Sequence, residues 1–371
     1  MPQALPPVRL GDQEPHAVDL LAVLDAAFAR AAERCRSGVR ESDYVLAGRR
    51  VRLRLAGKTL AQRIAEPFAH VRMTPVQAMA ASPCLTIDLW DERETGIRAA
   101  VETAANDFKV TLPTAGGAFA VSPDGRLIGY RIRQTVAWLD RKAERIVGSV
   151  ECADELSLHE RGKPLQVLLS VWHADQGTHV VHAGLVADNG NGVLLAGKGG
   201  TGKSTSTLAC VSAGFTYVGE DCIGLADRRG HAFVGHSLYS STWLEPADVA
   251  RFPLLAPHAV PATHPEERKS LILLSRAVGL QFARAVLIRA VALPRVVAAA
   301  ESRIRPASKH EALFALAPSS LLEMVPRPGA RGLERLADLV ERVPAYWLEM
   351  GRDLGRIPHC VREMLATATL S

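Results

Sequence analysis

Apolar side chains recur every three or four positions between residues 16 and 35, for example at Leu21, Leu24 and Phe28. This spacing predicts an amphipathic helix that packs on a core. In residues 50–55 the period changes to two, because arginines alternate with valine and leucine. That alternation predicts a half-buried strand whose arginines lie on a solvated face of a sheet.

The rest of the N-terminal part continues to change between helical and extended patterns. Residues 59–73 return to a helical rhythm, and residues 85–90 predict a short strand. Between residues 110 and 151, extended runs are separated by turn-forming segments such as Ser-Pro-Asp-Gly at 122–125, which predicts an antiparallel meander. We therefore expect residues 1–150 to form a smaller α+β domain, and we assign it no chemistry.

In the centre of the chain two extended runs flank a strong turn signal. Residues 178–187 and 193–196 lie on either side of Asp-Asn-Gly-Asn-Gly at 188–192. Asn-Gly pairs of this kind join hairpin strands, so the pattern predicts an antiparallel hairpin. Residues 165–172 are apolar enough to predict a buried helix, and further helices are expected at 309–316 and at 332–342.

A glycine-rich loop follows the second strand of this hairpin. Residues 197–204 read Gly-Lys-Gly-Gly-Thr-Gly-Lys-Ser and match the pattern G-x-x-x-x-G-K-[ST], with a helical run at 204–213 behind it. Glycines let backbone N–H groups converge on phosphate oxygens, and the start of the helix adds partial positive charge. Lys203 is expected to reach the β- and γ-phosphates of ATP, and the Ser204 hydroxyl to bind Mg²⁺. The predicted nucleotide contacts are Gly197, Lys198, Gly199, Gly200, Thr201, Gly202, Lys203, Ser204 and Thr205.

Two adjacent acids end the next extended run. Residues 215–219 predict a strand, and Glu220 and Asp221 follow it directly. A carboxylate at the end of a strand beside a phosphate loop can bind Mg²⁺, and a second carboxylate can accept the proton of an attacking hydroxyl. The pair therefore predicts two roles, although an exposed acidic turn is the alternative interpretation.

Composition and charge narrow the class of protein. The 371 residues are 48% hydrophobic and 22% charged, which predicts a folded chain of two domains, 1–150 and 151–371. A net charge of +5 is too small to indicate nucleic acid as a partner, and 5% aromatic residues offer no platform for bases. The six cysteines are scattered, and neither a secretory leader nor a membrane-spanning run is evident. We therefore expect a cytoplasmic protein without a membrane partner.

From His182 to Asp221 the sequence resembles the catalytic domain of the HPr kinase/phosphorylase family and the related serine kinases of bacterial gene clusters. His182 opens the hairpin, Gly-Val-Leu-Leu at 192–195 leads into the loop, and residues 213–221 keep a glycine and both acids in the family's register. The resemblance implies an α/β fold with a P-loop kinase domain of the HPr kinase and PEP carboxykinase-like type. In that type an antiparallel hairpin precedes the P-loop.

The resemblance also implies a role for each matching residue. The loop glycines and Lys203 would bind phosphate, Ser204 and Asp221 would bind Mg²⁺, Glu220 would be the general base, and His182 would lie near the transferred phosphate. The implied activity is transfer of the γ-phosphate of ATP to a hydroxyl, with Mg²⁺ as cofactor. The expected acceptor is Ser or Thr of a peptide or protein.

Glu220 stands where the family usually has Asp, which leaves open which of Glu220 and Asp221 is the base and which the metal ligand. Three further departures argue against HPr itself as the acceptor. Thr205 stands where HPr kinases have Glu. The Glu-x-Arg-Gly-Leu-Gly signature linked to HPr recognition is missing, and the family's N-terminal domain is not evident in residues 1–150.

Two other classes of protein stay open. Because of Lys198 the loop is similar to the deviant Walker A of ParA/MinD-type ATPases, in which the extra lysine reaches a partner's nucleotide across a dimer. A dimerising regulatory ATPase is therefore an alternative, although the ParA loop normally begins its chain. Assembly of the chain into a homo-oligomer stays open for either class. The other class is a nucleotide-binding module without transfer activity. Lys269, in a charged run at 266–269, is either a phosphate contact or a solvated side chain.

Overall fold

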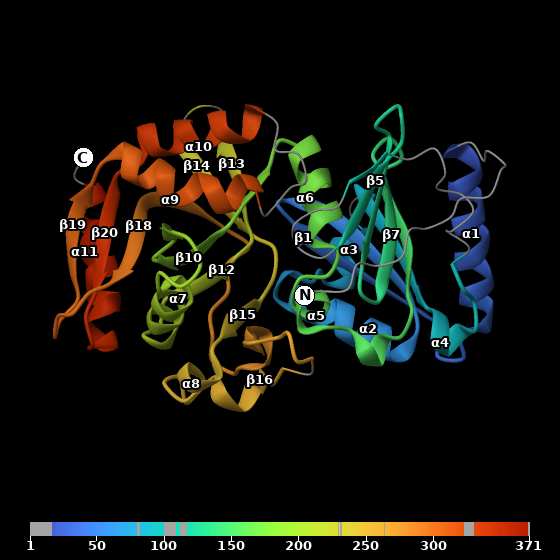
Figure 1. Ribbon diagram of the computed structural model, residues 1–371, viewed down its shortest axis with the longest axis horizontal. Coiled ribbons are helices and arrows are strands. Elements are labelled where there is room, and N and C mark those ends of the chain that lie inside the picture. The colour runs from blue at the N-terminus through green and yellow to red at the C-terminus, as the bar shows by residue number, and fades with distance from the viewer. Residues whose placement is uncertain are drawn as a thin grey trace, which may run out of the picture. The chain divides into compact units, whose positions relative to one another are not determined.

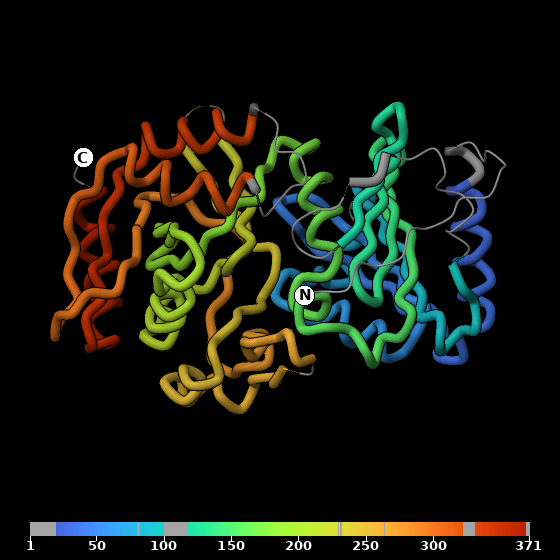
Figure 2. Tube along the Cα trace, in the orientation of Figure 1, coloured from blue at the N-terminus to red at the C-terminus, as the bar shows by residue number. Residues whose placement is uncertain are grey.

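The computed structural model describes residues 17–79, 82–99, 109–111, 117–228, 230, 232–262, 264–322 and 330–369 (Figures 1 and 2). The prediction that the chain has no secretory leader concerns its first residues, which lie outside these ranges. The described residues form a mixed α/β structure with an eight-stranded, a nine-stranded and a three-stranded sheet.

The chain divides into two compact units that are interleaved in the sequence. The first comprises Met1–Glu41, Arg54–Ala61 and Thr86–Glu155, and the second comprises Ser42–Leu53, Gln62–Leu85 and Leu156–Ser371. These units therefore do not follow a single cut at residue 150. Within the second unit the Phe68 ring lies 5.2 Å from the Tyr239 ring, and the backbone N–H of Ser240 donates to Pro67 O at 2.8 Å. Such contacts join an early segment to the later part of the chain.

Helix α1 (Ala17–Arg34) confirms the amphipathic helix predicted over residues 16–35. Leu24 and Phe28 are buried, and the Phe28 ring lies 6.5 Å from the Trp90 ring. The predicted strand at 85–90 and the predicted meander are also confirmed where the structure describes them. Their elements are β3 (Leu85–Asp91), α4 (Glu92–Thr95), β4 (Lys109–Thr111), β5 (Ala118–Val121), β6 (Leu127–Ile132), β7 (Thr135–Asp140), β8 (Arg145–Val150) and η2 (Ala153–Glu155).

The arginine-rich stretch forms a strand, but its arginines do not all face solvent. The eight-stranded sheet has the order β1-β2-β3-β8-β7-β6-β5-β4. Arg50 is 8% exposed and its Nε donates to Asp43 Oδ1 at 2.8 Å. The expectation of a solvated arginine face is therefore wrong at this position, because Arg50 balances a carboxylate. The elements here are β1 (Val39–Leu46), β2 (Arg49–Ala56), α2 (Lys58–Ala65), η1 (Glu66–Val71) and α3 (Pro75–Met79).

The nine-stranded sheet carries the glycine-rich loop. Seven of its strands run in the order β12-β10-β11-β18-β14-β13-β9, while β20 pairs with both β18 and β19. Its strands are β9 (His179–Val181), β10 (Ala183–Asp188), β11 (Asn191–Ala196), β12 (Thr216–Gly219), β13 (Ile223–Arg228), β14 (Ala232–Ser237), β18 (Ala285–Val296), β19 (Arg303–Ala307) and β20 (Ala345–Met350).

The hairpin before the loop forms, but its first strand is interrupted. Strands β10 and β11 pair antiparallel, from Ala183 opposite Ala196 to Asp188 opposite Asn191. The two turn residues between them have positive φ angles, as a tight hairpin turn requires. The single strand predicted over 178–187 is wrong, because the chain changes partners at His182: β9 pairs with β13, whereas β10 pairs with β11 and β12.

Strand directions bring distant segments to one edge of this sheet. Strand β10 is antiparallel to both β11 and β12, so β11 and β12 point the same way. Strand β18 is parallel to β11, and β20 is parallel to β18. The carboxyl ends of these four strands and the start of β10 therefore meet at the same edge, which is a common place for a ligand site in an α/β sheet.

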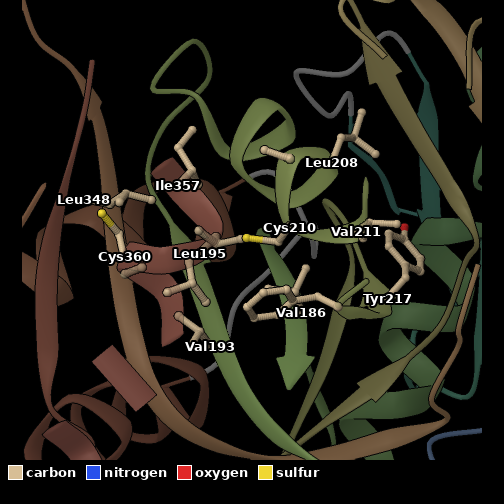
Figure 3. Packing of buried hydrophobic residues seen from close by; sticks show 14 of the residues in the cluster. Val186, Val193, Leu195, Leu208, Cys210, Val211, Tyr217, Leu348, Ile357 and Cys360 are labelled. Carbon is tan, nitrogen blue, oxygen red and sulfur yellow. The ribbon is translucent and has the colours of Figure 1, made fainter. Parts of the chain in front are cut away.

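Helices cover both faces of the nine-stranded sheet and enclose two hydrophobic cores. One core includes residues of α9 and α10, among them Leu316 and Leu339. The other, part of which is shown in Figure 3, packs α7 and α11 on the opposite face and includes Val193, Leu195 and Leu208. The helices of this unit are α5 (Leu158–Gly162), α6 (Gln166–Asp175), α7 (Lys203–Ser212), α8 (Pro246–Val249), η3 (Ala256–His258), η4 (Leu274–Arg276), α9 (Lys309–Leu322), α10 (Ala330–Arg342), η5 (Leu354–Arg356) and α11 (Ile357–Thr369).

A small antiparallel sheet completes the second unit. It has the order β15-β17-β16 and consists of β15 (Ser241–Leu244), β16 (Ala259–Val260) and β17 (Ser270–Leu273). In neither unit does a helix of the described ranges have the length and hydrophobicity needed to cross a bilayer.

Candidate active site

The glycine-rich loop connects the end of β11 to the start of α7. Gly197, Gly200 and Gly202 have φ angles of 152°, 81° and 101°, which disfavour residues with a side chain. A Cβ on Gly202 would also lie 2.6 Å from the sulfur of Met350 at the end of β20. A Cβ on Gly199 or Gly200 would meet nothing within 4 Å. The loop is thus tightly packed at its helix end and open at its crest, where a ligand can approach the backbone.

Lys203, the first residue of α7, folds back over this loop. Its side chain is buried, and its Nζ donates to Gly197 O at 2.6 Å and to Lys198 O at 3.2 Å. The Thr201 hydroxyl also donates to Lys198 O, at 2.9 Å. The side chain of Lys198 itself is exposed, and Ser204 is partly buried. The ammonium predicted to bind phosphate is therefore held at the loop by backbone carbonyls.

Asp221 lies between two basic side chains. Its Oδ2 accepts a hydrogen bond from Lys163 Nζ at 2.8 Å, and its Oδ1 lies 3.5 Å from His182 Nε2. Burial alone would raise the pKa of Asp221, but Lys163 and His182 outweigh it and hold the pKa below the usual range. Asp221 has a φ of 61°, a left-handed conformation that costs an L residue roughly 1 kcal/mol. Asp221 is thus an ionised carboxylate in a constrained backbone.

Glu220 differs sharply from its neighbour. It is 1% exposed, and neither carboxylate oxygen has a hydrogen-bond partner among the described residues. Burial, and then the charge of Asp221, raises the pKa of Glu220 to about 8, while the nearby Ser204 hydroxyl, Lys163 and Lys203 lower it. A buried carboxylate without partners is costly, so this group is poised to take up a proton or a cation.

The residues at this edge fit Mg²⁺. The ion prefers oxygen ligands and is usually bound by one or two carboxylates together with substrate phosphates. Ser204 and Asp221 supply such oxygens, and the unbonded carboxylate of Glu220 lies near them. In the described part of the chain no three His, Cys, Asp or Glu side chains form a metal cage. The arrangement therefore suits an ion that arrives with phosphates.

His182 lies at the start of β10, opposite the end of β11. Its backbone N–H donates to Ser320 Oγ at 3.1 Å. Burial lowers the pKa of His182 to about 4; Asp221 raises it, whereas Lys203, Lys163 and the exposed Lys269 lower it further. The imidazole is therefore neutral at pH 7.

The structure thus brings together all three side chains predicted to be catalytic, and beside them lies a buried lysine that the sequence patterns missed. Lys203, His182 and Glu220 lie at the same sheet edge, and Lys163 joins them from the end of helix α5. Lys163 belongs to no recognised motif. The sequence offered one signal for Lys163, namely that lysine is rare in this chain: only eight of its 44 Lys and Arg residues are lysines.

Comparison with known proteins gives limited information. No protein family model matches the chain, and no curated protein matches it. Similar solved structures include the Hpr(Ser) kinase/phosphatase from Coxiella burnetii, which is 14% identical. That match covers 52% of this chain and 91% of the other, with a TM-score of 0.28. Values this low assign neither a fold nor an activity to the chain.

Proposed function

We propose that the chain binds ATP with Mg²⁺ and transfers the γ-phosphate to a hydroxyl group. One observation carries the proposal: a buried glutamate without hydrogen-bond partners in the described residues lies at the same sheet edge as a complete phosphate loop. The loop supplies phosphate-binding amides, and Glu220 supplies a base beside them. The acceptor we propose is Ser or Thr of a peptide or protein, as the sequence resemblance implies.

Each residue then has a definite role. The loop amides and Lys203 bind the phosphates, and Ser204 and Asp221 hold Mg²⁺, which offsets phosphate charge when it is bound. The acceptor oxygen attacks the γ-phosphorus, its proton passes to Glu220, and the bond from the γ-phosphorus to the bridging oxygen breaks to release ADP. With its pKa raised to about 8, Glu220 is a stronger base than an ordinary glutamate once it is ionised; about a tenth of the molecules carry the ionised form at pH 7, and that form predominates above pH 8.

The proposal is tested with γ-³²P-labelled ATP and Mg²⁺, supplied with a library of Ser- and Thr-containing peptides or with buffer alone. We expect slow ATP turnover in buffer and faster turnover, with label on the peptide, when an acceptor is present. ATP-dependent dimerisation and hydrolysis without labelled acceptor would instead support the ParA-like alternative.

Lys203→Ala is the decisive variant for nucleotide use. We expect it to abolish ATP binding or turnover, because no other side chain of the loop supplies a buried ammonium. Turnover in this variant equal to that of the wild type would refute the proposal. Lys309→Met, at an exposed lysine on α9, is the matched control and should leave turnover unchanged.

A further inference from the structure

Lys163 is a buried cation that the proposed roles leave unexplained. It is 7% exposed and directly follows helix α5, where its backbone N–H donates to His159 O at 2.9 Å. Its Nζ lies 2.8 Å from Asp221 Oδ2. A buried ammonium loses its hydration and needs a compensating partner. The fold therefore brings Lys163 and Asp221 together, although 58 positions separate them in the sequence.

A second contact fixes Lys163 independently of the phosphate loop. Its Nζ lies 4.2 Å from the centre of the Trp243 ring, a distance at which a cation is attracted to the indole face. Gly162 makes room for this ring, because a Cβ there would lie 2.4 Å from Trp243 Cζ2. Trp243 belongs to β15 and pairs with Leu271 of β17. The small sheet thus sets the position of the ammonium.

Asp221 is consequently held from both sides. Lys163 contacts one carboxylate oxygen and His182 lies beside the other, while the backbone has a left-handed φ of 61°. Such a conformation persists when surrounding contacts determine it. Glu220, one position earlier, has no comparable support among the described residues. The two acids therefore differ in how firmly the ligand-free protein orients them.

We infer that Lys163 is a positioning residue, which orients the Asp221 carboxylate for the metal–nucleotide complex before that complex binds. The inference rests on the proposed function for the identity of that ligand. The role is distinct from phosphate binding, because Lys163 reaches the site through Asp221 and is braced by Trp243. Its loss should therefore weaken metal binding more than nucleotide binding.

The test measures the two affinities separately. Mn²⁺ binding to the full chain with ADP is followed by electron paramagnetic resonance, and ADP binding in EDTA by calorimetry. For Lys163→Met we expect Mn²⁺ affinity to fall by about 10-fold or more, the usual scale for losing a partner of a metal ligand. ADP affinity in EDTA should change by less than about 3-fold.

Two further variants keep the test decisive if Lys163→Met does not fold. Lys163→Arg restores the charge and should recover part of the Mn²⁺ affinity. Trp243→Leu keeps the ammonium but removes its brace, and should lower Mn²⁺ affinity by a smaller factor. Lys309→Met, at an exposed lysine, should leave both affinities unchanged.

The outcomes separate this inference from the proposed function. Unchanged Mn²⁺ affinity in all three site variants, or an equal loss of ADP affinity in EDTA, would overturn the role of Lys163. A wild-type protein that binds Mn²⁺ with ADP but labels no hydroxyl would refute phosphotransfer alone, because the affinity comparison still decides the role of Lys163. Failure of the wild-type protein to bind Mn²⁺ with ADP would overturn both.

Discussion

Two buried carboxylates, one in the eight-stranded sheet and one at the edge of the nine-stranded sheet, differ in their hydrogen bonding. Asp91, at the end of β3, is 4% exposed, and both of its oxygens are bonded. They accept backbone N–H groups from Glu94 and Ala153, each at 3.0 Å. Glu220, at the end of β12, is 1% exposed, and neither of its oxygens has a partner in the described residues.

This difference separates an acid that supports the fold from one to which we assign a chemical role. Asp91 caps helix α4 and supports the following turn, so its burial contributes to the fold. The burial of Glu220 is uncompensated by hydrogen bonds and costs stability. A buried acid that carries such a cost beside a phosphate loop is better explained by chemistry than by folding.

The largest expected effect is on Glu220. We expect Glu220→Gln to lower phosphotransfer by about 100-fold or more, because it removes the proposed general base. The free energy of unfolding should stay the same or rise at pH 7, because glutamine removes the cost of an acid whose pKa is raised on folding. Turnover of labelled ATP and urea denaturation measure the two effects. Turnover equal to that of the wild type would show that the unbonded Glu220, like the bonded Asp91, has no part in the reaction.

A buried histidine gives a second measure of how burial affects an ionisable side chain. His173 is 1% exposed beside Trp172, and neither ring nitrogen has a hydrogen-bond partner among the described residues. Burial, with smaller contributions from nearby positive charge, lowers its pKa to about 3, so it is neutral at pH 7. At pH 7, burying this neutral ring therefore costs less free energy than burying a charged side chain would.

The stability of the protein should accordingly fall with acid. Because the pKa of His173 is lower in the folded than in the unfolded chain, its contribution is complete above pH 6.5 and is lost progressively between pH 6.5 and 3. His173→Leu should reduce this loss by about 2 kcal/mol at pH 5. Urea denaturation at pH 5 and pH 8 measures it, with the exposed His359→Leu as control. Equal acid sensitivity in His173→Leu and wild type would contradict the prediction.

The smallest expected effect concerns a bonded carboxylate. Asp140 is 2% exposed and accepts two hydrogen bonds from Arg126, at 3.0 and 2.6 Å. Asp140→Asn replaces the carboxylate beside the Arg126 guanidinium with a neutral amide, and it should lower the free energy of unfolding by about 1.5 kcal/mol. ATP turnover should not change. A loss of turnover with unchanged stability would show that bonded and unbonded acids cannot be told apart in this way.

Local pattern was sufficient for the elements that build the phosphate loop. The hairpin turn, strand β11, the glycines and helix α7 follow one another directly, so nearby residues determine them. The predicted helices at 165–172, 309–316 and 332–342 are confirmed as α6, α9 and α10 for the same reason. The run at 165–172 is mostly apolar, and residues 332–342 have the apolar spacing of an amphipathic helix, so a short window of sequence reveals both.

Other features depend on partners far away in the chain. The interruption at His182 follows from β9 pairing with β13 and β10 pairing with β11. Met350, which packs on Gly202, follows the loop by nearly 150 positions, as Trp243 follows Lys163 by 80. No local periodicity contains such pairings.

By itself the sequence determined the phosphate loop, the flanking strand and helix, and the two adjacent acids, because these depend on neighbouring residues and on glycine's conformational freedom. Only the tertiary structure decided that Asp221 is bonded, that Glu220 is not, and that Lys163 accounts for the difference. The physical reason is that burial and charge compensation are properties of surroundings, which strand pairing assembles from distant segments.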